Sequence, residues 1–78
     1  MLPDPSPEWV LAHRRTIGTR IRDARHAAGL SQLQLGEATG LDHKTIHRVE
    51  YAMTDPSLSM LIRIAQAVHV PLGELVRS

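Results

Sequence analysis

Four basic side chains gather near the middle of the chain, at His43, Lys44, His47 and Arg48. Their rings and head groups donate hydrogen bonds, and lysine and arginine also carry a permanent positive charge. Such groups can bind phosphate oxygens or the acceptor atoms on the edges of nucleic-acid bases. Two histidines spaced i, i+4 on a helix can alternatively bind a metal ion. The chemistry open to this segment is therefore recognition of a polyanion or of a cation.

The metal alternative has little support elsewhere in the sequence. No glutamate follows His43 as in the zincin motif, no third ligand is indicated, and the chain contains no cysteine. We therefore expect no metal and no cofactor, and the simpler alternative for both histidines is that they are solvated helix residues. No catalytic motif appears either, so the protein is not expected to be an enzyme.

Composition sets the size and class of the protein. The 78 residues leave room for one domain, and 42% of them are hydrophobic with no Phe, which favours an aliphatic, helical core. Nine basic residues against eight acidic ones give a net charge of +1, so only the placement of charge can favour nucleic acid. No apolar run approaches the ~18 residues of a membrane span, and the start "MLPDPSP" lacks signal-peptide features. We expect a cytoplasmic protein with no membrane contact.

The elements that must position the basic side chains are five helices with no strand. Residues 1–6 hold two prolines and no periodicity, so we expect a flexible arm before a single domain over residues 7–78. The first helix is expected over about 7–28, with Ser6 as its cap, Pro7 at its first position and Gly29 at its end. Gly18 is a point at which this helix is expected to loosen or split.

Capping signals delimit the other helices. Ser31 and Gln34 form a capping box for the second helix, which Gly40 ends, and Asp42 caps the third. Residues 51–57 form a loop, after which Ser57 caps the fourth helix and Pro71 takes the first position of the fifth. The inward residues predicted from helical spacing are Val10, Ile17, Ile21, Ala24 and Ala28, then Ile46 and Val49, then Leu58, Leu61, Ile64, Ala65 and Val68, and finally Leu72, Leu75 and Val76.

A helix that ends at a glycine turn and is followed at once by another helix is the helix-turn-helix arrangement, expected here at about residues 31–51. The first helix supports the second, whose outer face can then enter a DNA major groove roughly 12 Å wide. Ile46 and Val49 supply the buried side of that second helix. The four basic residues named above lie on its other faces.

At these residues the sequence resembles the lambda-repressor-like (Cro/XRE) helix-turn-helix family, from Ile17 to Val76. The segments "GLSQ", "TIHRVE" and "PSLSMLIRIAQA" carry the resemblance jointly. It implies an all-α, five-helix DNA-binding domain. It also implies a sequence-specific transcriptional regulator that binds double-stranded DNA at a pseudo-palindromic operator as a homodimer. Ala52 departs from the family pattern, which has glycine in the turn after the third helix.

The resemblance also assigns roles to individual residues. Gln32 matches a glutamine that contacts phosphate and steadies the recognition helix, and Arg48 is placed to pair with guanine. Arg25 and Glu50 match a pair that bridges the first and third helices, with an ordinary surface ion pair as the alternative. The DNA-binding residues that the resemblance implies are Gln32, His43, Lys44, Thr45, His47, Arg48 and Tyr51.

Four apolar residues lie off the predicted inward stripes. Trp9, Leu33, Met53 and Met60 are therefore expected to be exposed, either as simple cover for the core or as a surface for a protein partner. With the low net charge, they favour an alternative function. In that alternative the scaffold is a protein-interaction module, an antitoxin or adaptor, for which DNA binding is secondary.

Overall fold

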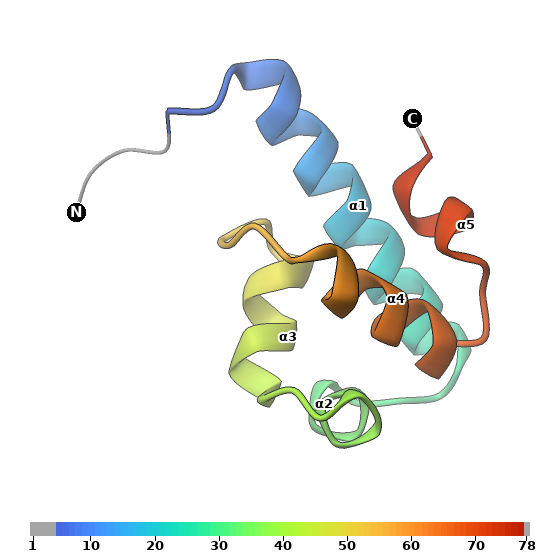
Figure 1. Cartoon of the computed structure of the whole chain (residues 1–78). Coiled ribbons are helices and arrows are strands. Elements are labelled where there is room, and N and C mark those ends of the chain that lie inside the picture. The colour runs from blue at the N-terminus through green and yellow to red at the C-terminus, as the bar shows by residue number, and fades with distance from the viewer. Residues whose placement is uncertain (1–4, 78) are drawn as a thin grey trace.

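The computed structural model describes residues 5–77, which form five α-helices joined by short loops (Figure 1). No strand occurs in this described range, so the all-α prediction is confirmed. Residues 1–4 of the predicted arm lie outside it, and the boundary between arm and domain stays a prediction. The helices are α1 (Glu8–Ala27), α2 (Gln32–Thr39), α3 (His43–Glu50), α4 (Leu58–Ala67) and α5 (Leu72–Val76).

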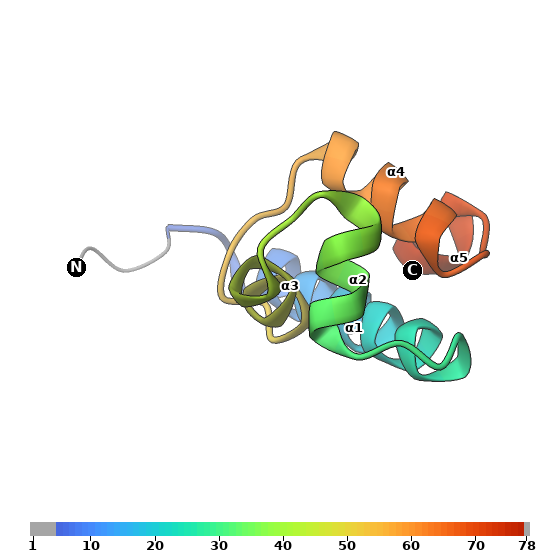
Figure 2. The ribbon, with the colours of Figure 1, turned by 90° about the horizontal axis from the view of Figure 1, so that it is seen from below.

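Helix α1 is the longest element, more than twice as long as α2 or α3. Helix α3 packs against α1 and α2, and α5 packs against α1 and α4. Seen from below, α2 and α3 lie side by side at an angle with α1 behind them (Figure 2). The predicted helix-turn-helix is therefore held on a scaffold formed by the other three helices.

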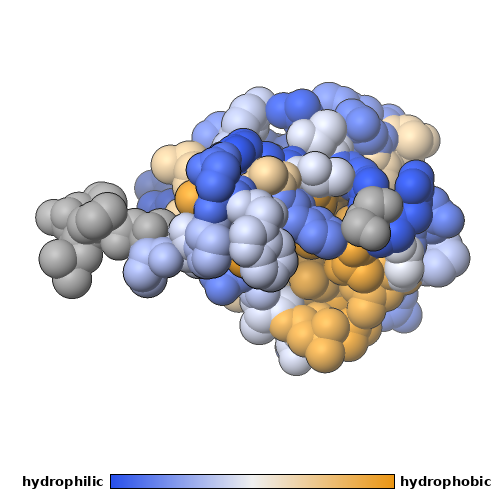
Figure 3. Space-filling model, turned by 90° about the horizontal axis from the view of Figure 1, so that it is seen from above, coloured by the Kyte–Doolittle hydropathy of each residue, from blue (hydrophilic) through white to orange (hydrophobic). Residues whose placement is uncertain are grey.

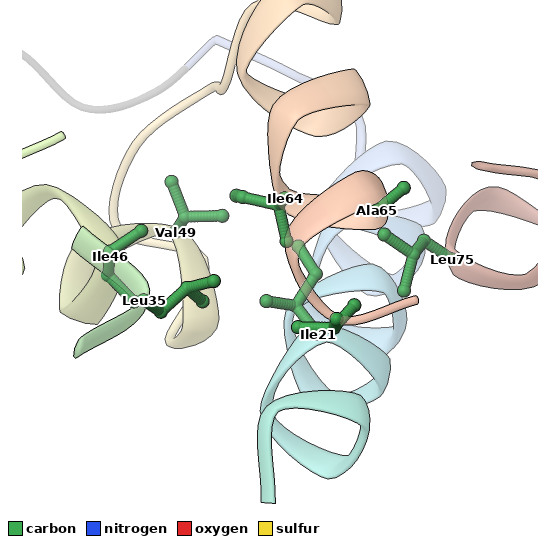
Figure 4. Packing of buried hydrophobic residues seen from close by; sticks show 8 residues of the cluster. Ile21, Leu35, Ile46, Val49, Ile64, Ala65 and Leu75 are labelled. Atoms are coloured by element: carbon green, nitrogen blue, oxygen red, sulfur yellow. The ribbon is translucent and has the colours of Figure 1, made fainter. Parts of the chain in front are cut away.

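Each helix contributes one fully buried aliphatic residue to a single core. In the close-up of this cluster, Ile46 and Leu35 lie on one side, Ile21 and Ile64 in the middle and Leu75 on the other side (Figure 4). Because all five helices contribute to the core, α2 and α3 cannot move away from the other helices without opening the core. The five fully buried residues are Ile21, Leu35, Ile46, Ile64 and Leu75.

Two of the predicted inward residues do not join this core. Leu58 is 64% exposed, and Val10 is only half-buried and lies outside the core cluster. Each lies in the first turn of its helix. Leu58 precedes Ile64 by about 9 Å along the helix axis, at 1.5 Å per residue. Helical spacing identifies the correct face, but that face extends beyond the end of the core.

The predicted helix ends are largely confirmed. Ser31 and Gln34 form the capping box of α2, while the side chains of Asp42 and Ser57 accept backbone hydrogen bonds at the starts of α3 and α4. Gly29 and Gly40 both adopt a left-handed backbone with φ of 73°. The predicted cap of α1 at Ser6 is wrong, because the N-cap is Pro7 and no side chain caps this helix. Pro7 and Pro71 both occupy the N-cap rather than the first helical position, where they were predicted to lie, and neither provides a side-chain cap.

The predicted break at Gly18 is wrong, because α1 continues through it without interruption. A Cβ atom at this position would lie 2.4 Å from the backbone oxygen of Glu50 and 2.8 Å from that of Val49. Glycine is therefore required because the last turn of α3 crosses α1 with its backbone in direct contact. No helix in the described part of the chain is long and apolar enough to span a membrane.

Candidate nucleic-acid interface

Helix α3 divides into a buried face and an exposed face, as predicted. Ile46 and Val49 are buried in the core, and Thr45 is half-buried. The four basic side chains of the helix are all exposed. The Asp42 carboxylate accepts a hydrogen bond from the backbone N–H of Lys44, which stabilises the start of the helix. The geometry therefore presents a row of donors to solvent on a helix anchored from behind.

A shallow hollow lies beside this exposed face, at the N-terminal end of α2. Its lining brings together five of the seven predicted DNA-binding residues. Met53, from the loop after α3, lines it as well, although the sequence suggested a protein-partner role for this residue. The lining residues are Gln32, His43, Lys44, His47, Arg48 and Met53.

The predicted Arg25–Glu50 pair is present and buried. Arg25 Nε donates to Glu50 Oε2 at 2.6 Å, and Arg25 Nη2 donates to Glu50 Oε1 at 3.0 Å. Arg25 Nη1 also donates to the backbone oxygen of Leu30 at 2.9 Å. The hydrogen bond to Glu50 is the main reason that the pKa of Arg25 is raised above its ordinary value. The alternative of an ordinary surface ion pair is therefore wrong.

Gln32 connects this buried pair to the exposed face. Its Nε2 atom donates to Glu50 Oε1 at 3.2 Å and lies 3.3 Å from Nδ1 of His47. The side chain thus links the first turn of α2 to the last two turns of α3, which agrees with a steadying role for this glutamine. The implied phosphate contact of Gln32 stays a prediction.

Tyr51 closes the C-terminal end of the exposed face. Its ring centroid lies 4.7 Å from that of His47, and the guanidinium carbon of Arg22 lies 5.3 Å from the Tyr51 ring centroid. A guanidinium within about 6 Å of a tyrosine ring is attracted to its π face. The sequence placed Arg22 among the arginines of the first helix, of which one or two were expected to contact phosphate, but did not reveal its contact with Tyr51. No local signal could, because Arg22 is on α1 and reaches Tyr51 only in the folded structure.

The predicted partner residues differ in exposure and in the elements that carry them. Trp9, Leu33 and Met53 are exposed, as predicted, but they come from α1, α2 and the loop after α3. Met60 is only partly exposed. Its predicted exposure is therefore wrong.

Helix α4 carries an exposed apolar pair that its sequence pattern did not predict. Leu58 and Ile62 lie one turn apart on α4, and both are exposed. Seen from above, apolar side chains gather on the side of the molecule where α4 lies (Figure 3). Exposed apolar area of this kind often marks an interaction surface.

The two histidines of α3 have different neighbours. His43 Nδ1 lies 3.3 Å from Asp42 Oδ1, whereas His47 Nδ1 faces Gln32. Within residues 5–77, no group of three or more histidine, cysteine or acidic side chains is arranged to hold a metal ion. The geometry therefore gives the i, i+4 histidine pair no third protein ligand in this range.

Comparison with known proteins agrees with this geometry. The helix-turn-helix family model matches residues 21–75, which is most of the chain. A protein of Methanocaldococcus jannaschii that is named as a helix-turn-helix-type transcriptional regulatory protein is 32% identical over 72 aligned residues. That match covers 86% of this chain but 23% of the relative. The chain thus spans about a quarter of the length of the curated relative that it matches.

Solved structures give the same result. The restriction-modification controller protein C.AhdI from Aeromonas hydrophila is 34% identical with a TM-score of 0.79, over 82% of this chain and 97% of that one. The hypothetical transcription factor NHTF from Neisseria is 27% identical with a TM-score of 0.79, over 97% of this chain and 86% of that one. These proteins are named as regulators rather than as enzymes. The chain belongs to the lambda-repressor-like (Cro/XRE) family of helix-turn-helix transcription regulators.

Proposed function

We propose that this protein is a sequence-specific DNA-binding regulator that places α3 in the major groove of its operator. One observation carries the proposal. Helix α3 exposes four hydrogen-bond donors on one face while Ile46 and Val49 anchor the opposite face in the core. A rigid helix with a polar outer face is what direct recognition of base edges requires.

The exposed residues divide by the contacts that their chemistry favours. Arg48 has the planar fork that pairs with both acceptors of guanine. Gln32, at the start of α2, lies where free backbone N–H groups attract phosphate. Lys44 carries an exposed ammonium group suited to phosphate oxygens. Thr45 and Tyr51 carry hydroxyls suited to phosphate oxygens. The set therefore combines contacts that position the protein with at least one that selects sequence.

We further propose that the protein binds a pseudo-palindromic site as a homodimer. The exposed pair Leu58 and Ile62 supports this, because it lies on α4 and leaves the outer face of α3 free for DNA. The two-fold axis of the dimer must coincide with that of the operator, which sets half-sites about one helical turn, ~34 Å, apart. Sedimentation at micromolar concentration with and without operator duplex tests the dimer. A Leu58→Ser variant that dimerises like the wild type contradicts this interface.

The alternative of a protein-interaction module, an antitoxin or adaptor, is supported by the exposed Trp9 and Leu33 and by the net charge of +1. Salt dependence separates the two functions. A DNA-binding protein loses affinity steeply as salt rises, with a slope set by the number of phosphates contacted. Absence of binding to random duplex at ~50 mM salt favours the interaction module.

Selection of binding sites from a random duplex pool tests the proposed function most directly. We expect one enriched motif with two inverted half-sites. An Arg48→Ala, Lys44→Ala double variant should lose the enrichment while keeping the helical circular dichroism spectrum. An unenriched pool with the wild-type protein contradicts sequence-specific binding.

A further inference from the structure

A chain of hydrogen bonds runs from the buried Arg25 to the exposed ring of His47. Arg25 donates twice to the carboxylate of Glu50, at 2.6 and 3.0 Å. Glu50 Oε1 also receives the Nε2 of Gln32 at 3.2 Å, and the same nitrogen lies 3.3 Å from His47 Nδ1. The chain therefore begins at a fixed positive charge and ends at an exposed side chain of the recognition helix.

The direction of each hydrogen bond follows from the chemistry of these groups. A carboxylate held by a guanidinium only accepts, so Gln32 must present its amide NH₂ to Glu50 rather than its carbonyl oxygen. The second N–H of that NH₂ is then available to His47. Because Nδ1 of His47 faces a donor, it must accept, and a neutral imidazole that accepts at Nδ1 carries its proton on Nε2.

We propose that this chain of hydrogen bonds selects the Nε2-protonated tautomer of the His47 imidazole, so that the edge of the ring that faces away from Gln32 donates a hydrogen bond to DNA. The acceptor is either a phosphate oxygen or a base acceptor in the major groove, such as a purine N7. Cytosine offers only its N4 donor there, so a base contact of this kind excludes cytosine. Gln32 is then a positioning residue that acts through His47. This inference rests on the proposed DNA-binding function.

The packing of the ring supports the same arrangement. The His47 ring packs against Tyr51 in a tilted arrangement, with ring centroids 4.7 Å apart and an angle of 38° between the ring planes, and Arg22 lies against the same tyrosine. These contacts limit rotation of the imidazole, so Nδ1 stays directed at Gln32 while Nε2 lies on the opposite side of the ring. His43 provides a contrast, because its Nδ1 faces the Asp42 carboxylate, an acceptor, at 3.3 Å. The two histidines should therefore differ in tautomer.

The first test uses the free protein, so it does not depend on DNA binding. Nitrogen-15 NMR of histidine-labelled protein at about pH 8, where neutral histidine predominates, distinguishes protonated from unprotonated ring nitrogens. We expect the wild-type His47 proton on Nε2. Gln32→Leu, which removes the amide but keeps much of its volume, should move His47 towards a tautomer mixture and leave His43 unchanged. A His47 proton on Nδ1, or an identical His47 spectrum in the variant, overturns the inference.

The second test identifies the acceptor on a selected operator. His47→Ala should weaken binding about 5- to 10-fold, the range expected for loss of one hydrogen bond. If a phosphate accepts the hydrogen bond, a neutral methylphosphonate at that phosphate should erase the affinity difference between wild type and His47→Ala. If a base accepts it, cytosine at that base position should erase the difference. Equal affinities of wild type and His47→Ala, or a difference that no single replacement erases, overturn the donor role. If the wild type selects no operator, the proposed function fails while the tautomer measurement still stands.

Discussion

Arg25 on α1 binds both carboxylate oxygens of Glu50 on α3, at 2.6 and 3.0 Å, on the buried side of the helix that exposes His43, Lys44, His47 and Arg48. Both residues are almost completely buried, with 7% and 2% of their surfaces exposed. Removing two charges from water is costly, and the bidentate geometry offsets much of that cost. Helix α3 is therefore fixed by a directional charged contact as well as by Ile46 and Val49, which pack without directional preference.

Removal of one partner of this pair should destabilise the protein strongly. Arg25→Met leaves the Glu50 carboxylate buried without its counter-charge, and such losses typically cost about 3–5 kcal/mol. Urea denaturation followed by circular dichroism measures the free energy of unfolding. Arg15, which pairs with Glu8 on the exposed surface, is the matched control, and Arg15→Met should change stability little. Comparable losses in the two variants contradict a structural role for the buried pair.

Gly18→Ala should also destabilise the protein, although alanine is the better helix former by about 1 kcal/mol. The added methyl group would lie 2.4 Å from the backbone oxygen of Glu50, so α1 and α3 must separate. Forced expansion of packed contacts costs about 1–3 kcal/mol. Gly73→Ala in α5 is the control, because its added Cβ meets no atom within 4 Å. Thermal melts should show a lower Tm for the first variant and an unchanged or higher Tm for the second.

Local signals predicted the helices because the residues that end a helix act within a few positions of one another. The Ser31–Gln34 capping box, the Asp42 cap and the left-handed glycine at Gly40 each depend on only one turn of chain. The resemblance to a known family supplied the Arg25–Glu50 pair, which local spacing cannot reveal. Its burial could not be predicted either, because burial depends on how closely α1 and α3 approach.

The parts that the sequence did not reveal are contacts between distant segments. Gly18 was expected to weaken α1 because glycine is a poor helix former. The close approach of its backbone to Glu50, which requires glycine, exists only in the folded structure. The bridge from Gln32 to His47 and the placement of Arg22 beside Tyr51 are of the same kind. Leu58 was predicted from periodicity to be buried but is exposed, because the apolar face of α4 extends past the end of the core.

Ala52→Gly should stabilise the protein. Ala52 follows α3 with φ of 57°, a left-handed conformation in which alanine is strained and glycine is not. Its N–H and that of Met53 bond to the carbonyls of Val49 and Arg48, so this turn closes the recognition helix. We expect a gain of up to about 1 kcal/mol, measured by urea denaturation.

Ala12 supplies the control for this substitution. It is an exposed residue within α1, where the right-handed backbone suits alanine. Ala12→Gly should therefore cost up to about 1 kcal/mol. Opposite signs for the two alanine-to-glycine changes identify backbone conformation as the cause. A loss of stability in both variants contradicts strain at Ala52.

Arg48 and Lys44 should affect DNA binding in different ways. If Arg48 pairs with guanine, Arg48→Ala should reduce discrimination at one operator position by about 1–3 kcal/mol. If Lys44 contacts phosphate, Lys44→Ala should weaken binding to all sequences alike and reduce the salt slope by about 1. Fluorescence anisotropy against operator and single-base variants, at several salt concentrations, measures both quantities. Arg63, an exposed arginine on α4, is the control, and Arg63→Ala should preserve base preference. Equal loss of base discrimination in the Arg48 and Lys44 variants contradicts this division, because a phosphate contact carries no direct sequence information.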